Sequence, residues 1–389
     1  MFEQYLIYSA IILLLGTVVS ALAEKLNISN TMFLTFIGMV FGAFGLIIFP
    51  RDTIIFISTL SIILVVFDST IKLKYKEIQK FSSYSMRLVL IFFIINFIVL
   101  SISTSCLFNF SSTSNINLIL VLIFTFMMYG IDHEFFLSMG RQKKELVKIA
   151  EIESLINRSL TLIIPLVLLN YLQAIISKSN LPVYVEWWIY FKQIFISAIF
   201  GIIAGAIVVA ILNTRLKEHI SYLIALTSSV ILYVLSEGVQ ANGVLSLTVF
   251  TLILGNYHLK HKHELKKFMS LFAYIFNIFV FILIGTVMLI DFKYVLKGTY
   301  LFLIFLLGRF LSVHLALCGS KFGLKEKLFL VLNGVKGIDV AIIILIMMTR
   351  FENLPGIEII VNLSLLFCLY SIIITSVSST ILKRIQKCH

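Results

Sequence analysis

Seven ionisable side chains fall well inside long apolar stretches of the sequence. They comprise four carboxylates and three cations: Asp68, Asp132, Glu153, Asp339, Arg158, Arg309 and Lys336. A charge near the centre of a bilayer costs at least about 2.5 kcal/mol, so each of these groups needs a partner or a function. We interpret the seven as one functional cluster that binds ions or carries protons; the alternative is a set of separate structural ion pairs.

The apolar stretches are long enough to cross a membrane. Of the 389 residues, 60% are hydrophobic and 13% are charged, whereas soluble domains are about 25% charged. Lipid offers the backbone no hydrogen bonds, so segments that span its roughly 30 Å hydrocarbon core have to be helices. We therefore expect an all-α polytopic membrane protein with about 13 transmembrane helices, at residues 5–23, 30–49, 53–71, 88–108, 117–139, 149–172, 188–212, 219–236, 240–257, 268–290, 298–317, 328–349 and 358–382.

The fifth and twelfth expected helices share the tripeptide Gly-Ile-Asp, at residues 130–132 and 337–339. Interrupted helices at corresponding positions of two inverted repeats point to a transporter site. A break leaves amide ends with partial positive charge and carbonyl ends with partial negative charge inside the bilayer. If the two breaks cross, Asp132 suits the amide ends and Lys336 the carbonyl ends. Glycines that merely permit close packing would explain the Gly residues but not the adjoining charges.

This spacing predicts two inverted six-helix repeats with discontinuous helices 5 and 12. The first repeat covers about residues 1–172, a linker helix covers about 188–212, and the second repeat covers about 219–389. The connections are short and no Pro- or Ser-rich linker interrupts the chain. We therefore expect one transmembrane domain over residues 1–389.

The basic residues are concentrated in alternate loops. The net charge is +12, and about 22 of the 31 Lys and Arg residues fall on one side of the expected helices, with about five on the other. Cytoplasmic loops carry the excess of Lys and Arg, so we expect a multi-pass protein of the cytoplasmic membrane with its N-terminus outside and its C-terminus inside. The same distribution argues against a nucleic-acid partner, which would require the basic residues on one face.

The sequence offers little support for metal or enzyme chemistry. The four cysteines are scattered without ligand spacing, and we interpret them as packing residues: Cys106, Cys318, Cys368 and Cys388. Three histidines at positions 258, 261 and 263 alternate with lysines, which is typical of a basic cytoplasmic loop rather than a metal site. With no phosphate-binding glycine loop and no nucleophile motif, we expect neither a cofactor nor an enzyme.

Four segments resemble the monovalent cation:proton antiporter family, and within it the bacterial and archaeal sodium/proton exchangers. Residues 64–73, which contain Asp68, resemble the acidic position of its third helix. Residues 151–157 read Glu-Ile-Glu-Ser-Leu-Ile-Asn and resemble the family's Glu-Gly-Glu-Ser-Leu-Leu-Asn on helix six. Residues 308–313 are similar to Arg-x-Leu-Ser/Gly-Val on helix eleven, and residues 334–337 to Gly-x-Arg-Gly at the second helix break.

The resemblance implies a fold, partners and residue roles. The fold comprises a dimerisation domain and a six-helix core domain that moves its ion site across the lipid bilayer. A homodimer that exchanges a monovalent cation for protons is expected. Glu153 would pair with Arg309, and Asp68, Ser154 and Asn157 would lie near the ion.

One residue departs from the family at a decisive place. The residue that follows the asparagine is, in the family, an aspartate that binds the cation and exchanges it for protons; here it is Arg158. The Thr-Asp-Pro of helix five is also replaced, by Ile131-Asp132-His133. A guanidinium offers five donors and no acceptor, and at about 5 Å it would oppose cation binding by roughly 3 kcal/mol. We expect Arg158 to pair with Asp132 or Asp68.

Three functions are compatible with these residues. The first is a cation/proton antiporter by alternating access, whose carrier has moved to Asp68, Asp132 or Asp339. The second is a transporter in which Arg158 and Lys336 select an anion or an organic acid. The third is a transport-silent antiporter homologue that acts as a sensor or a subunit. We favour the first, because the remaining acids are present.

Overall fold

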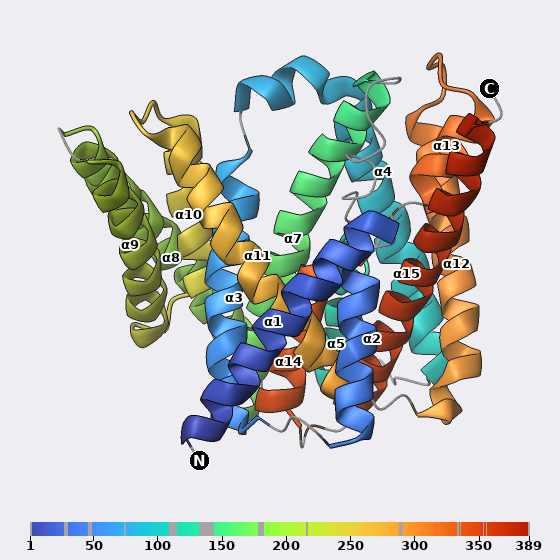
Figure 1. Cartoon of the computed structure of the whole chain (residues 1–389), viewed down its shortest axis with the longest axis horizontal. Helices are drawn as coiled ribbons and strands as arrows, with labels where there is room; N and C mark the ends of the chain where they lie inside the picture. The colour runs from blue at the N-terminus through green and yellow to red at the C-terminus, as the bar shows by residue number, and fades with distance from the viewer. Residues whose placement is uncertain are drawn as a thin grey trace. The chain divides into compact units, whose positions relative to one another are not determined.

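The chain is almost entirely helical where its structure is described. The computed structural model describes residues 2–26, 30–45, 49–73, 75–108, 115–131, 144–177, 183–214, 217–287, 291–332, 334, 336–352, 354 and 356–387. Within these residues the chain forms 14 α-helices and no strand (Figure 1). They are α1 (Phe2–Leu26), α2 (Asn30–Ala43), α3 (Arg51–Ile71), α4 (Tyr75–Phe108), α5 (Asn115–Met127), α7 (Lys144–Ser177), α8 (Val183–Leu212), α9 (Glu218–Gly238), α10 (Gly243–Asn256), α11 (Lys262–Val287), α12 (Phe292–Ala316), α13 (Leu324–Leu332), α14 (Ile338–Arg350) and α15 (Ile357–Lys387).

The lengths and composition of these helices are those of a multi-pass membrane protein. Eight of the described helices are long and apolar enough to cross a membrane, and four shorter helices are also apolar. Lipid-exposed backbone must be satisfied within its own segment, which accounts for the helical architecture. The expected all-α membrane fold is therefore confirmed, whereas the number of 13 spans and the inverted repeats stay predictions.

The twelfth expected helix is interrupted where the sequence predicted. α13 ends at Leu332 and α14 begins at Ile338, so the Gly-Val-Lys-Gly segment lies between two helices. The fifth expected helix also ends early, because α5 stops at Met127 and a turn follows. Asp132 and His133, which continue that segment, lie outside the described residues.

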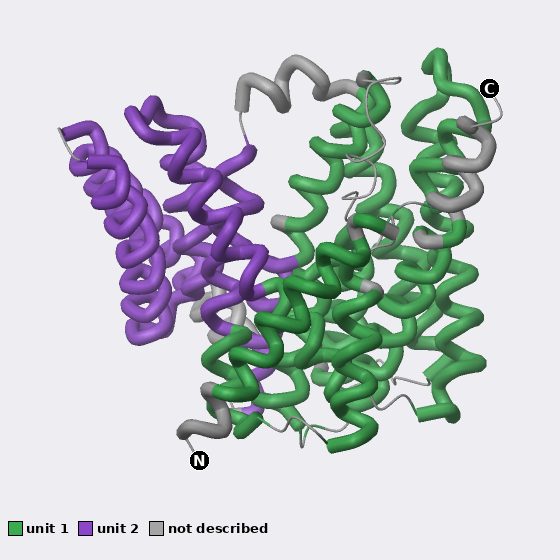
Figure 2. The backbone as a smooth tube through the Cα atoms, in the orientation of Figure 1, with its two compact units in different colours: residues 1–58, 81–161, 277–389 green, residues 59–80, 162–276 purple. Residues whose placement is uncertain are grey.

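The chain forms two compact units, each assembled from separate segments (Figure 2). The first comprises residues 1–58, 81–161 and 277–389, and the second comprises residues 59–80 and 162–276. In the first unit α15 packs against α12, α14 and α5, and in the second α8 packs against α9 and α10. The boundaries of the two units differ from those expected for the inverted repeats, and the repeats stay predictions.

Helix α14 is almost entirely buried. Its residues from Ile338 to Met347 are buried on every side. A helix that is apolar and buried all round is typical of the core of a large protein. The break that precedes α14 is consequently held inside the protein.

Two helices of the first unit approach each other through glycines. α2 carries Gly38 and Gly42 at the four-residue spacing of a close helix contact. A methyl group on Gly38 would lie 2.8 Å from the Cα of Gly285 in α11, and one on Gly42 would lie 2.9 Å from the Cα of Thr286. Because the obstructing atoms belong to the backbone, neither helix can give way by changing a side-chain rotamer.

We expect Gly38→Ala to lower the thermal unfolding midpoint of the purified protein, since overpacking a tight contact costs about 1–3 kcal/mol. Gly238→Ala is the matched control, because Gly238 ends α9 and has no atom within 4 Å of the added methyl group. There the substitution should be neutral or slightly stabilising. Equal midpoints for the two variants would show that the α2–α11 contact is not tight.

Candidate functional site

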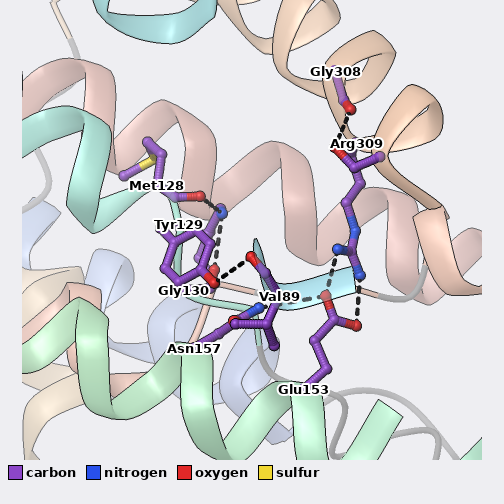
Figure 3. Close-up of polar contacts among 10 residues, drawn as sticks. Val89, Met128, Tyr129, Gly130, Glu153, Asn157, Gly308 and Arg309 are labelled. Atoms are coloured by element: carbon purple, nitrogen blue, oxygen red, sulfur yellow. Dashed lines mark hydrogen bonds and ion pairs between the residues drawn. The ribbon is translucent and has the colours of Figure 1, made fainter. Parts of the chain in front are cut away.

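Lys336 lies in the break between α13 and α14 and is fully buried. Its Nζ donates hydrogen bonds to the carbonyl oxygens of Met128, at 2.5 Å, and Gly130, at 2.9 Å. Figure 3 shows the two carbonyl groups converging on one nitrogen atom. These carbonyls belong to the turn that directly follows α5, so Lys336 meets the carbonyl end that the sequence assigned to it. A cation at this position interacts favourably with the negative end of a helix.

Other side chains complete the carbonyl end of α5. Asn96 of α4 donates a hydrogen bond to the carbonyl of Thr125 at 2.9 Å, and Thr161 of α7 donates one to the carbonyl of Phe126 at 3.3 Å. The last carbonyls of a helix have no partner within it. The interrupted end of α5 is therefore satisfied by side chains from three other segments.

Aromatic rings lie beneath two of the buried cations. The Lys336 Nζ is 4.2 Å from the ring centre of Phe305, and the Arg309 guanidinium is 4.6 Å from that of Phe92. Phe92 also stacks on Tyr129 at 5.2 Å and meets the ring of Phe305 edge-on at 6.1 Å. A cation over a ring face is stabilised by the ring quadrupole, and more strongly so away from water. The sequence reasoning missed these rings, because one phenylalanine among 35 carries no signal of its own.

Glu153 and Arg309 form a buried bidentate ion pair between α7 and α12. The two N···O distances are 2.5 and 2.9 Å, and the side chains are 0% and 1% exposed. Figure 3 shows the carboxylate and the guanidinium facing each other edge to edge. This fork-to-fork geometry is the strongest arrangement available to the pair. It is also the contact that the family resemblance implied.

Arg158 pairs with Asp339, a partner that the sequence analysis did not name. The Arg158 Nε lies 3.3 Å from the Asp339 Oδ1, and the side chains are 15% and 2% exposed. Of the two expected partners, Asp132 lies outside the described residues, so that pairing stays a prediction, and Asp68 pairs with Lys72. Sequence spacing does not show which helix break packs against α7. The pairing of Arg158 with Asp339 therefore could not be predicted from the sequence.

Asp339 also occupies a helix N-terminus. It lies in the first turn of α14, next to amide groups that have no partner within the helix. A carboxylate in the first turn of a helix is stabilised by the positive end of the helix dipole. Asp339 thus meets both a helix end and a guanidinium, which are two sources of positive charge.

Asn157 and Ser154 lie on α7 near these pairs in sequence. Asn157 is fully buried, and its Nδ2 donates a long hydrogen bond of 3.4 Å to Glu153. Its Oδ1 is buried and accepts no hydrogen bond from a described residue. Ser154 is half-buried. A buried oxygen without a donor is the kind of group that a hard cation would coordinate.

Asp68 belongs to the second unit, whereas the other described candidates belong to the first. Its Oδ2 accepts a hydrogen bond of 2.6 Å from Lys72, four residues later on α3. Its Oδ1 is buried and accepts no hydrogen bond from a described residue. The pairing with Lys72 could have been inferred from the four-residue spacing. The place of Asp68 near an ion stays a prediction.

The described residues provide no group of three or more His, Cys, Asp or Glu side chains that could hold a metal ion. Around the break, Arg309 and Arg158 pair with Glu153 and Asp339, and Lys336 donates to carbonyl oxygens after α5.

We expect Glu153→Gln to destabilise the protein strongly, because breaking a buried ion pair costs about 3–5 kcal/mol. Glu145→Gln is the matched control on the same helix: its pair with Lys321, at 2.9 Å, has side chains that are more than half exposed. Exposed pairs contribute only about 0–1 kcal/mol. Thermal unfolding of both variants tests this difference, and equal shifts would contradict a stabilising role for the Glu153–Arg309 pair.

Part of the chain is similar to curated transporters. Over 205 residues, which are 51% of this chain, it is 25% identical to the K(+)/H(+) antiporter NhaP2 of Shewanella oneidensis. The NhaP2 of Shewanella sp. strain MR-4 is also 25% identical over 205 residues. The match spans 35% of each of these proteins, about a third of their length.

The fold and the family are shared over nearly the whole chain. The structure of the sodium proton antiporter MjNhaP1 from Methanocaldococcus jannaschii superposes with a TM-score of 0.76 at 20% identity, over 98% of this chain and 96% of that one. A second structure of MjNhaP1, from electron microscopy, gives 0.72 at 19% identity with the same coverage. The family model described as sodium/hydrogen exchanger, transmembrane, matches residues 10–385. The chain therefore belongs to the sodium/hydrogen exchanger family.

Proposed function

We propose that this protein exchanges a monovalent cation for protons across the cytoplasmic membrane by alternating access. Family membership and the fold shared with a sodium proton antiporter support the proposal. The names of the NhaP2 relatives, which are K(+)/H(+) antiporters, point to the same class of reaction. The excess of Lys and Arg in alternate loops supports an N-terminus outside the cell and a C-terminus in the cytoplasm.

The observation that carries the proposal is the charged break between α13 and α14. Lys336 precedes Gly337 and faces the carbonyl end of α5, while Asp339 follows it and faces Arg158. Broken helices with opposite charges at their ends are the usual place for a transporter's substrate and coupling ions. A purely structural membrane helix would need neither the break nor the charges.

The cation would be held by oxygen atoms around this break. Asp339 and Asn157 provide buried oxygens, and Ser154 adds a hydroxyl group on α7. Asp132 and Asp68 stay candidates from the sequence alone. Hard cations such as sodium prefer oxygen ligands. In this proposal Asp339 supplies the negative charge that the family's aspartate would supply on α7, where this chain has Arg158.

The anion alternative has less support from the same geometry. An anion would need cations that are not already neutralised. Arg158 lies 3.3 Å from a carboxylate, and Lys336 donates to two carbonyl oxygens. Arg158 is thus neutralised by Asp339, and two N–H groups of Lys336 are already directed at the chain's own carbonyls. A homodimer, which the family resemblance implies, completes the proposal.

Exchange in proteoliposomes that contain a pH-sensitive dye tests the proposal. A pulse of sodium, lithium or potassium should collapse a preformed proton gradient in vesicles that contain the wild-type protein. Asp339→Asn should abolish the response, because it removes a carboxylate from the site and leaves Arg158 without its described counter-charge. Asp52→Asn, at an exposed position in the first turn of α3, should exchange as the wild type does.

Three results would contradict the proposal or part of it. No response of the wild type to any of the three cations between about pH 6 and 9 would contradict antiport. Activity that appears only in Arg158→Asp would identify a transport-silent scaffold. Full activity of Asp339→Asn would remove Asp339 from the site while leaving antiport itself intact.

A further inference from the structure

We infer that the amine of Lys336 carries the proton that is exchanged, an inference that rests on the proposed antiport. The described ionisable groups around the break fall into two kinds. Glu153 and Asp339 are each paired with an arginine, whereas Lys336 donates to carbonyl oxygens. A carboxylate that gains a proton leaves its arginine without a counter-charge. A lysine on carbonyl oxygens can lose a proton without leaving any charge unpaired.

The two carboxylates are held in their ionised form. Protonation of Glu153 would leave the Arg309 guanidinium, which is 1% exposed, without a counter-charge. Protonation of Asp339 would do the same to Arg158 and would also remove the negative charge from the first turn of α14. An uncompensated buried charge is strongly destabilising. The arginines cannot carry the proton either, because a guanidinium keeps it throughout the pH range in which proteins work.

Lys336 can change its charge without losing its contacts. The ammonium form has three N–H donors, and the structure uses two of them, on the carbonyls of Met128 and Gly130. The neutral amine keeps two N–H donors, so both carbonyl oxygens remain satisfied after one proton has left. The third N–H is not hydrogen-bonded to any described residue, and the ring of Phe305 lies 4.2 Å from the nitrogen.

The charge of the described cluster also fits an exchange. Two carboxylates and two arginines cancel, so the cluster carries the single positive charge of the Lys336 ammonium. When the ammonium gives its proton to water, leaving an amine and a hydronium ion, the cluster becomes neutral. A monovalent cation that then binds restores the single positive charge. Proton and cation thus replace each other electrostatically.

Other ionisable groups lie near Lys336. Arg309 of α12, Asp339 of α14 and Cys368 of α15 act on it directly, and Glu153 and Arg158 of α7 are the ion-pair partners of Arg309 and Asp339. Tyr129 lies in the turn after α5, between the two residues whose carbonyls Lys336 contacts. Among the described residues none of these side chains is hydrogen-bonded to the Nζ. The four charged side chains among them form two ion pairs, whereas Lys336 is hydrogen-bonded to carbonyl oxygens.

The Lys336→Arg variant tests whether Lys336 carries a proton or only caps the carbonyl end of α5. Arginine keeps the positive charge and can donate to the carbonyls of α5, but it cannot release a proton. Lys297→Arg is the matched control, because Lys297 also donates to a helix carbonyl, that of Leu107 at 3.0 Å, and lies over an aromatic ring, yet is exposed. Both variants would be reconstituted and tested for sodium-, lithium- and potassium-driven proton movement from about pH 6 to 9.

We expect Lys336→Arg to unfold near the wild-type temperature but to exchange about 100-fold more slowly, the lower end of what a positioned proton-transfer group contributes. Lys297→Arg should retain the wild-type rate and pH dependence. If Lys336→Arg exchanges with the wild-type rate and pH dependence, Lys336 only caps α5 and the inference is overturned while antiport stands. If the wild type itself exchanges no cation, the proposed function fails first.

A second variant keeps the test decisive if arginine does not fit. Lys336→Gln retains an amide group with two N–H donors for the carbonyls but carries no exchangeable charge. A folded Lys336→Gln protein that has lost exchange supports the inference. A folded Lys336→Gln protein that still couples cation to proton movement overturns it.

Discussion

A charge inside an apolar protein has to be neutralised by its immediate neighbours, and much of the first unit follows from this constraint. Four of the five described charges around the α13–α14 break are at most 2% exposed, so water does not solvate them. The protein neutralises them by a bidentate pair, a second ion pair and a lysine on helix carbonyls. Each contact joins segments that are far apart in the sequence. The electrostatic requirement therefore determines which helices pack together.

Helix α7 connects the two ion pairs. Glu153 and Asn157 are four residues apart and share a face of the helix, whereas Arg158 is turned one position further. Through these side chains α7 contacts both α12 and α14. A conformational change that moves α7 against these helices has to preserve the pairs or replace their partners. A bound cation is one such replacement, because it can take the place of an arginine beside a carboxylate.

The sequence predicted the charged residues and the helix break of this site, but not which of these residues contact each other. Charges in apolar spans stand out because lipid penalises them, and the repeated Gly-Ile-Asp identified the break that α13 and α14 show. The partner of Arg158 could not be predicted, because any of several acids satisfies the same requirement until the helices are packed. The rings of Phe92 and Phe305 were equally hidden, since aromatic residues occur throughout the spans. Hydrophobic periodicity in a sequence predicts which side chains are buried. It does not predict which buried side chains contact each other.

Proton release on cation binding tests the central claim most directly. The purified wild-type protein in detergent and weak buffer would be titrated with sodium, lithium and potassium chloride while the pH is recorded. A site at which cation and proton replace each other predicts that at least one of the three cations releases protons, with choline chloride as the control for ionic strength. Binding of a cation without proton release, or no effect of any of the three between about pH 6 and 9, would contradict it.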